Sequence, residues 1–270
     1  MNKPIWPLLL AVVLGIVGSI AWYLYQPDAP PPAPPPQAAT PAPAPPAAPT
    51  HYPIEDAAPA ASPPKPLPAL DDSDAAAQDA LAGLVERQTL SDLFQLKGLI
   101  RRIVATIDNL PREKVSARLS SFKPVPGHFA TAGTDAALSI SPANYQRYTP
   151  YVRLAGAVDA RKLAAVYAQL YPLFQQAYAD LGYPNSYFND RLVQVIDHLL
   201  ATPAAPATLR LVQPNLLYQY ADPELESLSA GQKILLRMGP DNAAVVKGKL
   251  QEIRAEVTSR VHRPRQGGER

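Results

Sequence analysis

The chain has 270 residues, a formal net charge of +2, 33 prolines and no cysteine. The lack of cysteine excludes disulfides, cysteine-ligated zinc and thiol catalysis. Residues 69–259 contain 19 basic and 19 acidic side chains, so this region has no excess positive charge to neutralise phosphates. We therefore predict that the chain does not bind nucleic acid.

The first distinctive segment is the uncharged, mostly apolar run of residues 4–25. A helix rises about 1.5 Å per residue, so roughly 20 residues cross a hydrocarbon core about 30 Å thick. Trp6 lies near one end of the run, and Trp22 and Tyr23 lie near the other. Aromatic side chains of this kind gather at membrane interfaces. We predict a transmembrane signal-anchor within residues 1–26 that contacts the lipid bilayer through the uncharged run.

The charges around this run predict its orientation. Lys3 precedes the run, and the next Lys or Arg is Lys65. Positive residues stay on the cytoplasmic side, so we expect the N-terminus in the cytoplasm and the rest of the chain outside it. A cleaved signal peptide is the alternative, because Ser19 and Ala21 are small residues at cleavage spacing. The single lysine and the long apolar run favour a retained anchor.

Proline and alanine dominate residues 27–68, which contain 18 of the 33 prolines. Proline fixes φ and has no N–H donor, so helices and sheets do not propagate. We predict a disordered linker of polyproline II character that reaches at most about 130 Å, at about 3.1 Å per residue. His51 and Tyr52 interrupt the tract, and we find no reason for them in the sequence.

Residues 69–260 show mainly helical periodicity, which predicts a mainly α domain with a few short strands, an α+β arrangement. Helices are predicted over about 71–86, 89–109, 143–157, 160–181, 186–200 and 230–238, and from 240 onward, with Pro150 interrupting or offsetting the third. Asp159 is predicted to cap the helix that starts at 160, and Ser229 with Gln232 to form a capping box before the helix 230–238. Pro172 is predicted to kink or split its helix. Short strands are predicted at 115–122, 128–132, 137–140 and 208–212. The segment 261–270, which has a net positive charge, is predicted to be a disordered basic tail.

His198 is the obvious candidate for catalysis. On its predicted helix it lies with Asp190, Arg191, Gln194 and Asp197 opposite the apolar stripe. This pattern is typical of a solvated face, so we predict no catalytic role for the histidine. A metal site needs three or four converging ligands, and we find no such spacing. We predict no metal, no cofactor and no catalytic residue.

Tyrosine is the unusual residue type, with 13 copies. Its apolar ring and polar tip suit protein or glycan recognition. Some of the tyrosines fall in predicted loops beside amide side chains. The candidate binding residues are Tyr183, Asn185, Tyr187 and Asn189 in one loop, and Tyr145 and Tyr148 in an earlier segment. Packing at the edge of the core is the alternative interpretation.

Three stretches carry a family resemblance: residues 145–151 (YQRYTPY), 181–191 (LGYPNSYFNDR) and 229–240 (SAGQKILLRMGP). They resemble an uncharacterised bacterial envelope family that is catalogued only as a domain of unknown function. The resemblance covers roughly residues 67–256. It implies a Gram-negative inner-membrane protein whose outward side faces the periplasm, and it implies no activity or ligand.

These observations favour a single-pass inner-membrane protein that presents a periplasmic binding or scaffold domain. Its expected partner is an envelope protein or a glycan. The alternative is a membrane-tethered periplasmic enzyme that acts on the cell wall or on glycans.

Overall fold

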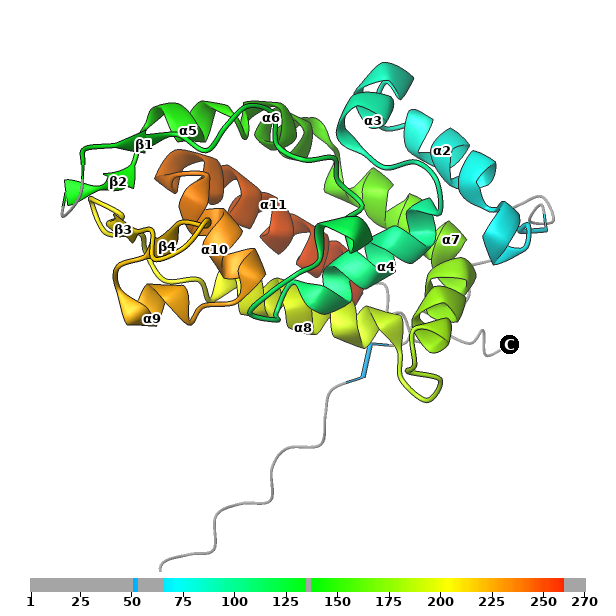
Figure 1. The fold of residues 1–270 in the computed structure, drawn as a ribbon. Coiled ribbons are helices and arrows are strands. Elements are labelled where there is room, and N and C mark those ends of the chain that lie inside the picture. Colours follow the sequence, from blue (N-terminus) through cyan, green and yellow to red (C-terminus); the bar gives the residue numbers. More distant parts are fainter. Residues whose placement is uncertain (1–50, 53–65, 135–136, 260–270) are drawn as a thin grey trace, which may run out of the picture. The chain divides into compact units, whose positions relative to one another are not determined.

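A computed structural model describes residues 51–52, 66–134 and 137–259, all within the unit Pro49–Arg270 (Figure 1). The predicted anchor, most of the predicted linker and the predicted basic tail lie outside the described residues. Among the helices that are described, none has both the length and the apolar character needed to cross a membrane.

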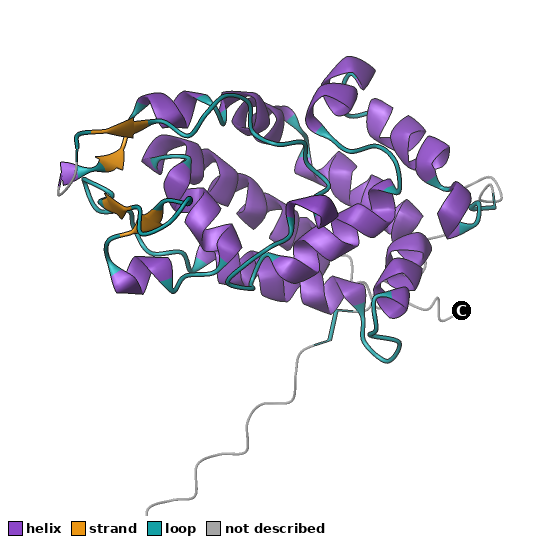
Figure 2. Ribbon diagram, viewed as in Figure 1, coloured by secondary structure: helices purple, strands orange, loops and turns teal. Residues whose placement is uncertain are grey.

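Helices dominate the described residues, and the strands are short (Figure 2). The α-helices are α2 (Asp74–Ala82), α3 (Arg87–Leu93), α4 (Leu99–Asn109), α5 (Ala143–Gln146), α6 (Thr149–Ala157), α7 (Ala160–Asp180), α8 (Phe188–Leu200), α9 (Pro223–Glu226), α10 (Ala230–Arg237) and α11 (Pro240–Ser259). Two 3-10 turns are η1 (Leu70–Asp72) and η2 (Ala117–Leu119). The strands β1 (Thr131–Ala132) and β2 (Ser139–Ile140) form one antiparallel pair, and β3 (Leu211–Val212) and β4 (Gln219–Tyr220) form another. The prediction of a mainly helical domain with a few short strands is confirmed.

The main core forms where α4, α7 and α8 pack together. Leu99 and Val104 of α4 are buried against Leu173 and Phe174 of α7 and Phe188 of α8. Burying an apolar side chain of this size stabilises a fold by about 1.5–3 kcal/mol. Helix α11 packs against α6, α7 and α8. Its Val257 is buried in a smaller cluster with residues of α7 and α8. Packing against α4, α7 and α11 thus positions the start of α8, where the candidate site lies.

The prediction of a single helix over 89–109 is wrong. It is divided into α3 and α4, and Gly98 before α4 has φ +64°. That left-handed conformation favours glycine. The Asp74 carboxylate accepts hydrogen bonds from the backbone N–H groups of Gly98 and Leu99, at 2.8 and 2.9 Å. These groups would lack partners at a helix start, so a side chain of α2 determines where α4 begins.

Several other sequence signals were read correctly. Asp159 caps α7 by accepting a hydrogen bond from Lys162 N at 2.9 Å. Ser229 and Gln232 form the predicted capping box of α10. The signal at Pro172 differs: the predicted split of the helix does not occur, since α7 continues through this proline to Asp180.

The strand predictions are only partly right. Residues 117–119 form a 3-10 turn instead of part of a strand, and β4 was not predicted. Beyond the turn, Phe122 pairs with Phe94 in an isolated bridge. The pairing partner comes from the segment between α3 and α4, which local sequence does not reveal.

A buried carboxylate joins α4 to α8. Asp108 has a side chain only 2% exposed, and its Oδ1 accepts a hydrogen bond from Arg191 Nε at 2.9 Å. Its Oδ2 accepts another from Arg112 at 2.9 Å. Arg191 also donates to the backbone carbonyl of Asp108 at 2.8 Å. Both carboxylate oxygens are therefore paired in the interior.

Candidate functional site

The loop of residues 181–187 joins α7 to α8 and carries most of the predicted binding residues. Tyr187 is 49% exposed, and Asn185 is also exposed. Tyr183 is half-buried because its ring stacks on Tyr178, with centroids 4.7 Å apart. At the other end of the loop, Phe188 is fully buried. The exposed tip is therefore held between two packed aromatic residues.

Asn189 differs from the expectation that its amide lies free beside the loop tyrosines. Its side chain is wholly buried, between α7 and a segment from the predicted linker. The Tyr167 hydroxyl donates to its Oδ1 at 3.2 Å. Its Nδ2 donates to the backbone carbonyl of Tyr52 at 2.8 Å. Asn189 binds main chain from the N-terminal tract and is not part of an open surface.

Asp190 binds the same segment from the first turn of α8. Its Oδ1 accepts a hydrogen bond from Tyr52 N at 2.6 Å, and its Oδ2 lies 2.8 Å from His51 Nδ1. A carboxylate at this end of a helix is favoured by the helix dipole. Two adjacent side chains therefore bind both main-chain groups of Tyr52, and one of them also binds the His51 imidazole. In Figure 1 the blue segment lies beside the start of α8.

The Tyr52 side chain packs on an apolar surface of three helices. This surface consists of Ala164 of α7, Val193 of α8 and Val257 of α11, with Ile253 at its edge. The ring of His51 meets the ring of Tyr187 edge-on, with centroids 6.1 Å apart. The segment therefore adjoins the exposed loop.

Arg254 of α11 lies at the end of the Tyr52 side chain. Hydrogen bonding to Asp197 of α8 raises the pKa of Arg254, and the Tyr52 phenol raises it further to a smaller extent. Two bonds hold the guanidinium to that carboxylate, one of them 3.0 Å long between Nη2 and Oδ2. The polar end of Tyr52 thus lies beside a cation that is held in place by α8.

Burial also affects two tyrosines of α7 near Asn189. It raises the pKa of Tyr167 well above its ordinary value, and it raises the pKa of Tyr171 to about 12. Both phenols therefore keep their protons at neutral pH and remain donors. This is the form in which Tyr167 donates to Asn189 and Tyr171 donates to Gln175.

Tyr145 and Tyr148 do not join this site. Tyr148 is 9% exposed and belongs to a core cluster with Val152 and Leu235. Tyr145 is half-buried in another cluster, and its ring lies directly against Gly239, where an added Cβ would be 2.6 Å from Cγ. The structure thus gives both side chains a packing role, the alternative interpretation of the sequence.

His198 also differs from the expectation of a solvated side chain. It is half-buried, and its Nε2 lies 2.8 Å from Ser229 Oγ. Such proximity is what an activated serine nucleophile requires. Ser229, however, is 6% exposed and uses its hydroxyl to accept a hydrogen bond from Gln232 N. Because it is buried as a helix cap, we base no catalytic proposal on this pair.

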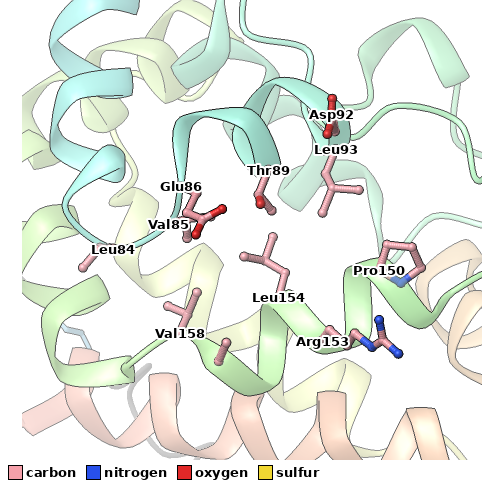
Figure 3. Close-up of a pocket in the computed structure, with 11 residues that line it drawn as sticks. Leu84, Val85, Glu86, Thr89, Asp92, Leu93, Pro150, Arg153, Leu154 and Val158 are labelled. Carbon is pink, nitrogen blue, oxygen red and sulfur yellow. The ribbon is translucent and has the colours of Figure 1, made fainter.

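A separate apolar pocket lies between the start of α3 and α6, and it was not predicted (Figure 3). Its volume is about 630 Å³. Its apolar lining includes Leu84, Val85, Leu154 and Val158, and its charged lining residues are Glu86, Asp92 and Arg153. Leu154 points toward Thr89 across the pocket. Among the described residues, no group of three or more His, Asp or Glu side chains could hold a metal ion.

The functional residues that sequence reasoning missed are His51 and Tyr52. Within residues 27–68, Tyr52 is the only Phe, Trp or Tyr, and His51 is the only histidine. An aromatic pair in a tract that otherwise cannot form a core is a signal that the segment binds elsewhere. The sequence does not predict where the segment binds, because the partner residues are about 138 positions away along the chain.

The fold and site define a mainly helical domain that holds a segment of its own N-terminal tract through main-chain and aromatic contacts. Residues 99–254, more than half of the chain, match the family described as "Protein of unknown function (DUF3014)", and the chain belongs to this family. The expectation of a family of unknown function is confirmed, although the match begins at α4 and not near residue 67. No curated protein and no solved structure gives a significant match.

Proposed function

We propose that this chain is a single-pass inner-membrane protein that presents the described domain in the periplasm as a binding module. The anchor is residues 4–25, and the partner is an envelope protein, with a glycan as the other class that tyrosine and asparagine side chains suit. The observation that carries the binding role is the exposed pair Asn185 and Tyr187 at the tip of a loop with fixed ends.

The loop is suited to binding because it has little conformational freedom left to lose when a partner binds. Stacking of Tyr183 on Tyr178 holds one end, and the buried Phe188 holds the other. Side chains that are already positioned lose less entropy when a partner binds. An exposed tyrosine also supplies a large apolar area together with a hydroxyl group. These properties are typical of residues that dominate interface energies.

Site-specific crosslinking in cells tests the binding role. A photo-crosslinking amino acid at the exposed Pro184 should give one main adduct, which mass spectrometry assigns to protein or glycan. Asn185→Ala combined with Tyr187→Ala should reduce its yield at least about tenfold, because interface aromatics can each contribute about 2 kcal/mol. The matched control changes two exposed residues of α7, Gln169→Ala with Gln176→Ala, and should leave the yield unchanged. Equal yields from both double variants would contradict the proposal.

A reporter fusion tests the topology. Lys3 is the only charged residue before the apolar run, and no Lys or Arg follows until Lys65. A reporter that is active only in the periplasm should therefore work when fused after Arg270. A reporter that is active only in the cytoplasm should fail there. The reverse result would show that the assigned orientation is wrong.

A further inference from the structure

The start of α8 has the features of a site built for an extended peptide. Asn189 and Asp190 bind the carbonyl and the N–H of the same residue, Tyr52, at 2.8 and 2.6 Å. We propose that they form, with the apolar surface on α7, α8 and α11, a peptide-binding site for a His-Tyr segment. We further propose that its occupant is His51–Tyr52 of the same chain, which fastens the proline-rich linker to the domain. We call this site the linker socket.

The linker socket recognises more than main chain. The tyrosine ring packs among Ala164, Val193 and Val257, which are all buried. Its hydroxyl end lies beside the Arg254 guanidinium. The preceding histidine contacts both the Asp190 carboxylate and an aromatic ring of the loop. A residue without a ring would leave the apolar surface uncovered, and the two main-chain bonds alone would not hold the segment. The ligand class is therefore an extended peptide with an aromatic residue after a hydrogen-bonding one.

Asn189 shows that the linker socket is an integral part of the domain. Its amide is fully buried, and the Tyr167 hydroxyl fixes its oxygen, which leaves Nδ2 directed at the Tyr52 carbonyl. With the segment bound, both the oxygen and the Nδ2 group of this buried amide have a hydrogen-bond partner, as buried polar groups require. Asn189, Asp190 and Arg254 lie within the residues that match the family, whereas His51 and Tyr52 lie outside them. The receptor belongs to the domain, and the ligand belongs to the preceding tract.

The sequence around Tyr52 prepares it for this role. Tyr52 is followed by Pro53, and a residue before proline is restricted to extended conformations. It therefore presents its N–H and carbonyl with little loss of entropy. A short tether between ligand and receptor gives an effective concentration in the millimolar range. An intrinsic dissociation constant near 0.1 mM, which is roughly ten times lower, would then keep the segment bound most of the time.

The linker socket has a consequence for reach, which rests on the proposed anchor. If the whole of residues 27–68 spans the distance from the membrane, the reach is at most about 130 Å. If the tract is fastened at residue 52, only residues 27–51 span it, and the reach falls to at most about 80 Å. Release of the segment would therefore increase the maximum reach by about 50 Å.

Hydrogen exchange of the Tyr52 amide tests the proposal on the full chain in detergent. Pro49 and Pro53 have no N–H, so few amides lie near Tyr52 and its exchange is easily assigned. In the wild-type chain we expect this amide to exchange at least about tenfold more slowly than the intrinsic rate, as the effective concentration implies. Exchange at the intrinsic rate would overturn the proposal.

Variants identify the groups responsible. Asp190→Ala removes the acceptor of the Tyr52 N–H and should abolish the protection, whereas Asp180→Ala, an exposed aspartate of α7 that pairs with Arg101, should keep it. Tyr52→Ala should also abolish protection at residue 52, and Tyr52→Phe should retain most of it. Because Tyr52 lies outside the helices, these two variants test the socket even if Asp190→Ala perturbs α8. Protection that survives both alanine variants would overturn the proposal.

Dilution of the protein distinguishes the source of the occupant. Protection by the same chain is independent of protein concentration. Protection that weakens on dilution would assign the occupant to a second copy and overturn the assignment to the same chain. The result is independent of the crosslinking and reporter experiments: the amide can be protected whether or not the loop binds a partner, so the two proposals fail separately.

Discussion

Phe188→Ala is expected to destabilise the domain by about 4 kcal/mol, the cost typical of removing a fully buried phenylalanine ring. Phe188 is 0% exposed at the first position of α8. Its ring stacks on Phe174 with centroids 5.7 Å apart and an interplanar angle of 4°, and it also contacts Tyr178 at 5.6 Å. The cavity left by alanine would lie at the centre of the main core, where α4, α7 and α8 meet.

Chemical denaturation measures this effect as a shift of the unfolding midpoint. The adjacent Tyr187→Ala is the matched control, because this tyrosine is 49% exposed and should change stability by no more than about 0.5 kcal/mol. The pair separates folding from binding within two consecutive residues. Similar losses of stability in both variants would contradict the prediction that Phe188, and not Tyr187, stabilises the core.

Asp108→Ala is expected to cost about 3 kcal/mol, the lower end of the range for breaking a buried ion pair by removing one partner. The variant leaves Arg191, whose side chain is only 21% exposed, without its carboxylate. Arg112 loses its partner as well, although it is largely exposed and can be solvated. The cost arises mainly from the arginine that stays in the interior.

The control for this prediction is Asp79→Ala. Asp79 pairs with Arg87 at 2.8 Å, but both side chains are exposed, at 67% and 69%. Exposed ion pairs contribute at most about 1 kcal/mol, so this variant should unfold almost as the wild type does. Asp108→Leu combined with Arg191→Met should recover much of the lost stability, because it removes both buried charges. Equal effects of Asp108→Ala and Asp79→Ala would contradict the role assigned to burial.

Sequence reasoning succeeded where structure depends on neighbours in the chain. The periodicity of α4 and α8, the Asp159 cap and the capping box at Ser229 all depend on residues within one or two helical turns. The exposure of Asn185 and Tyr187 was also anticipated, because a loop between two periodic segments lies at the surface. These features follow from hydrogen bonds and side-chain spacing that can be counted along the sequence.

The same reasoning failed where one side chain meets a distant one. Asn189 was placed on an open loop because no local pattern shows that Tyr167 and Tyr52 enclose its amide. His198 was placed on a solvated face because helical periodicity does not show that the cap of α10 lies against it.

The sequence by itself determined a mainly helical domain behind a proline-rich tract, since composition and periodicity are local properties. The tertiary structure decided what the site is made of. It buried Tyr148, began α4 through a carboxylate on α2, and brought Asn189 and Asp190 to the main chain of Tyr52. The physical reason is that a buried polar group must find a hydrogen-bond partner, and in a folded chain that partner can come from any distance along the sequence.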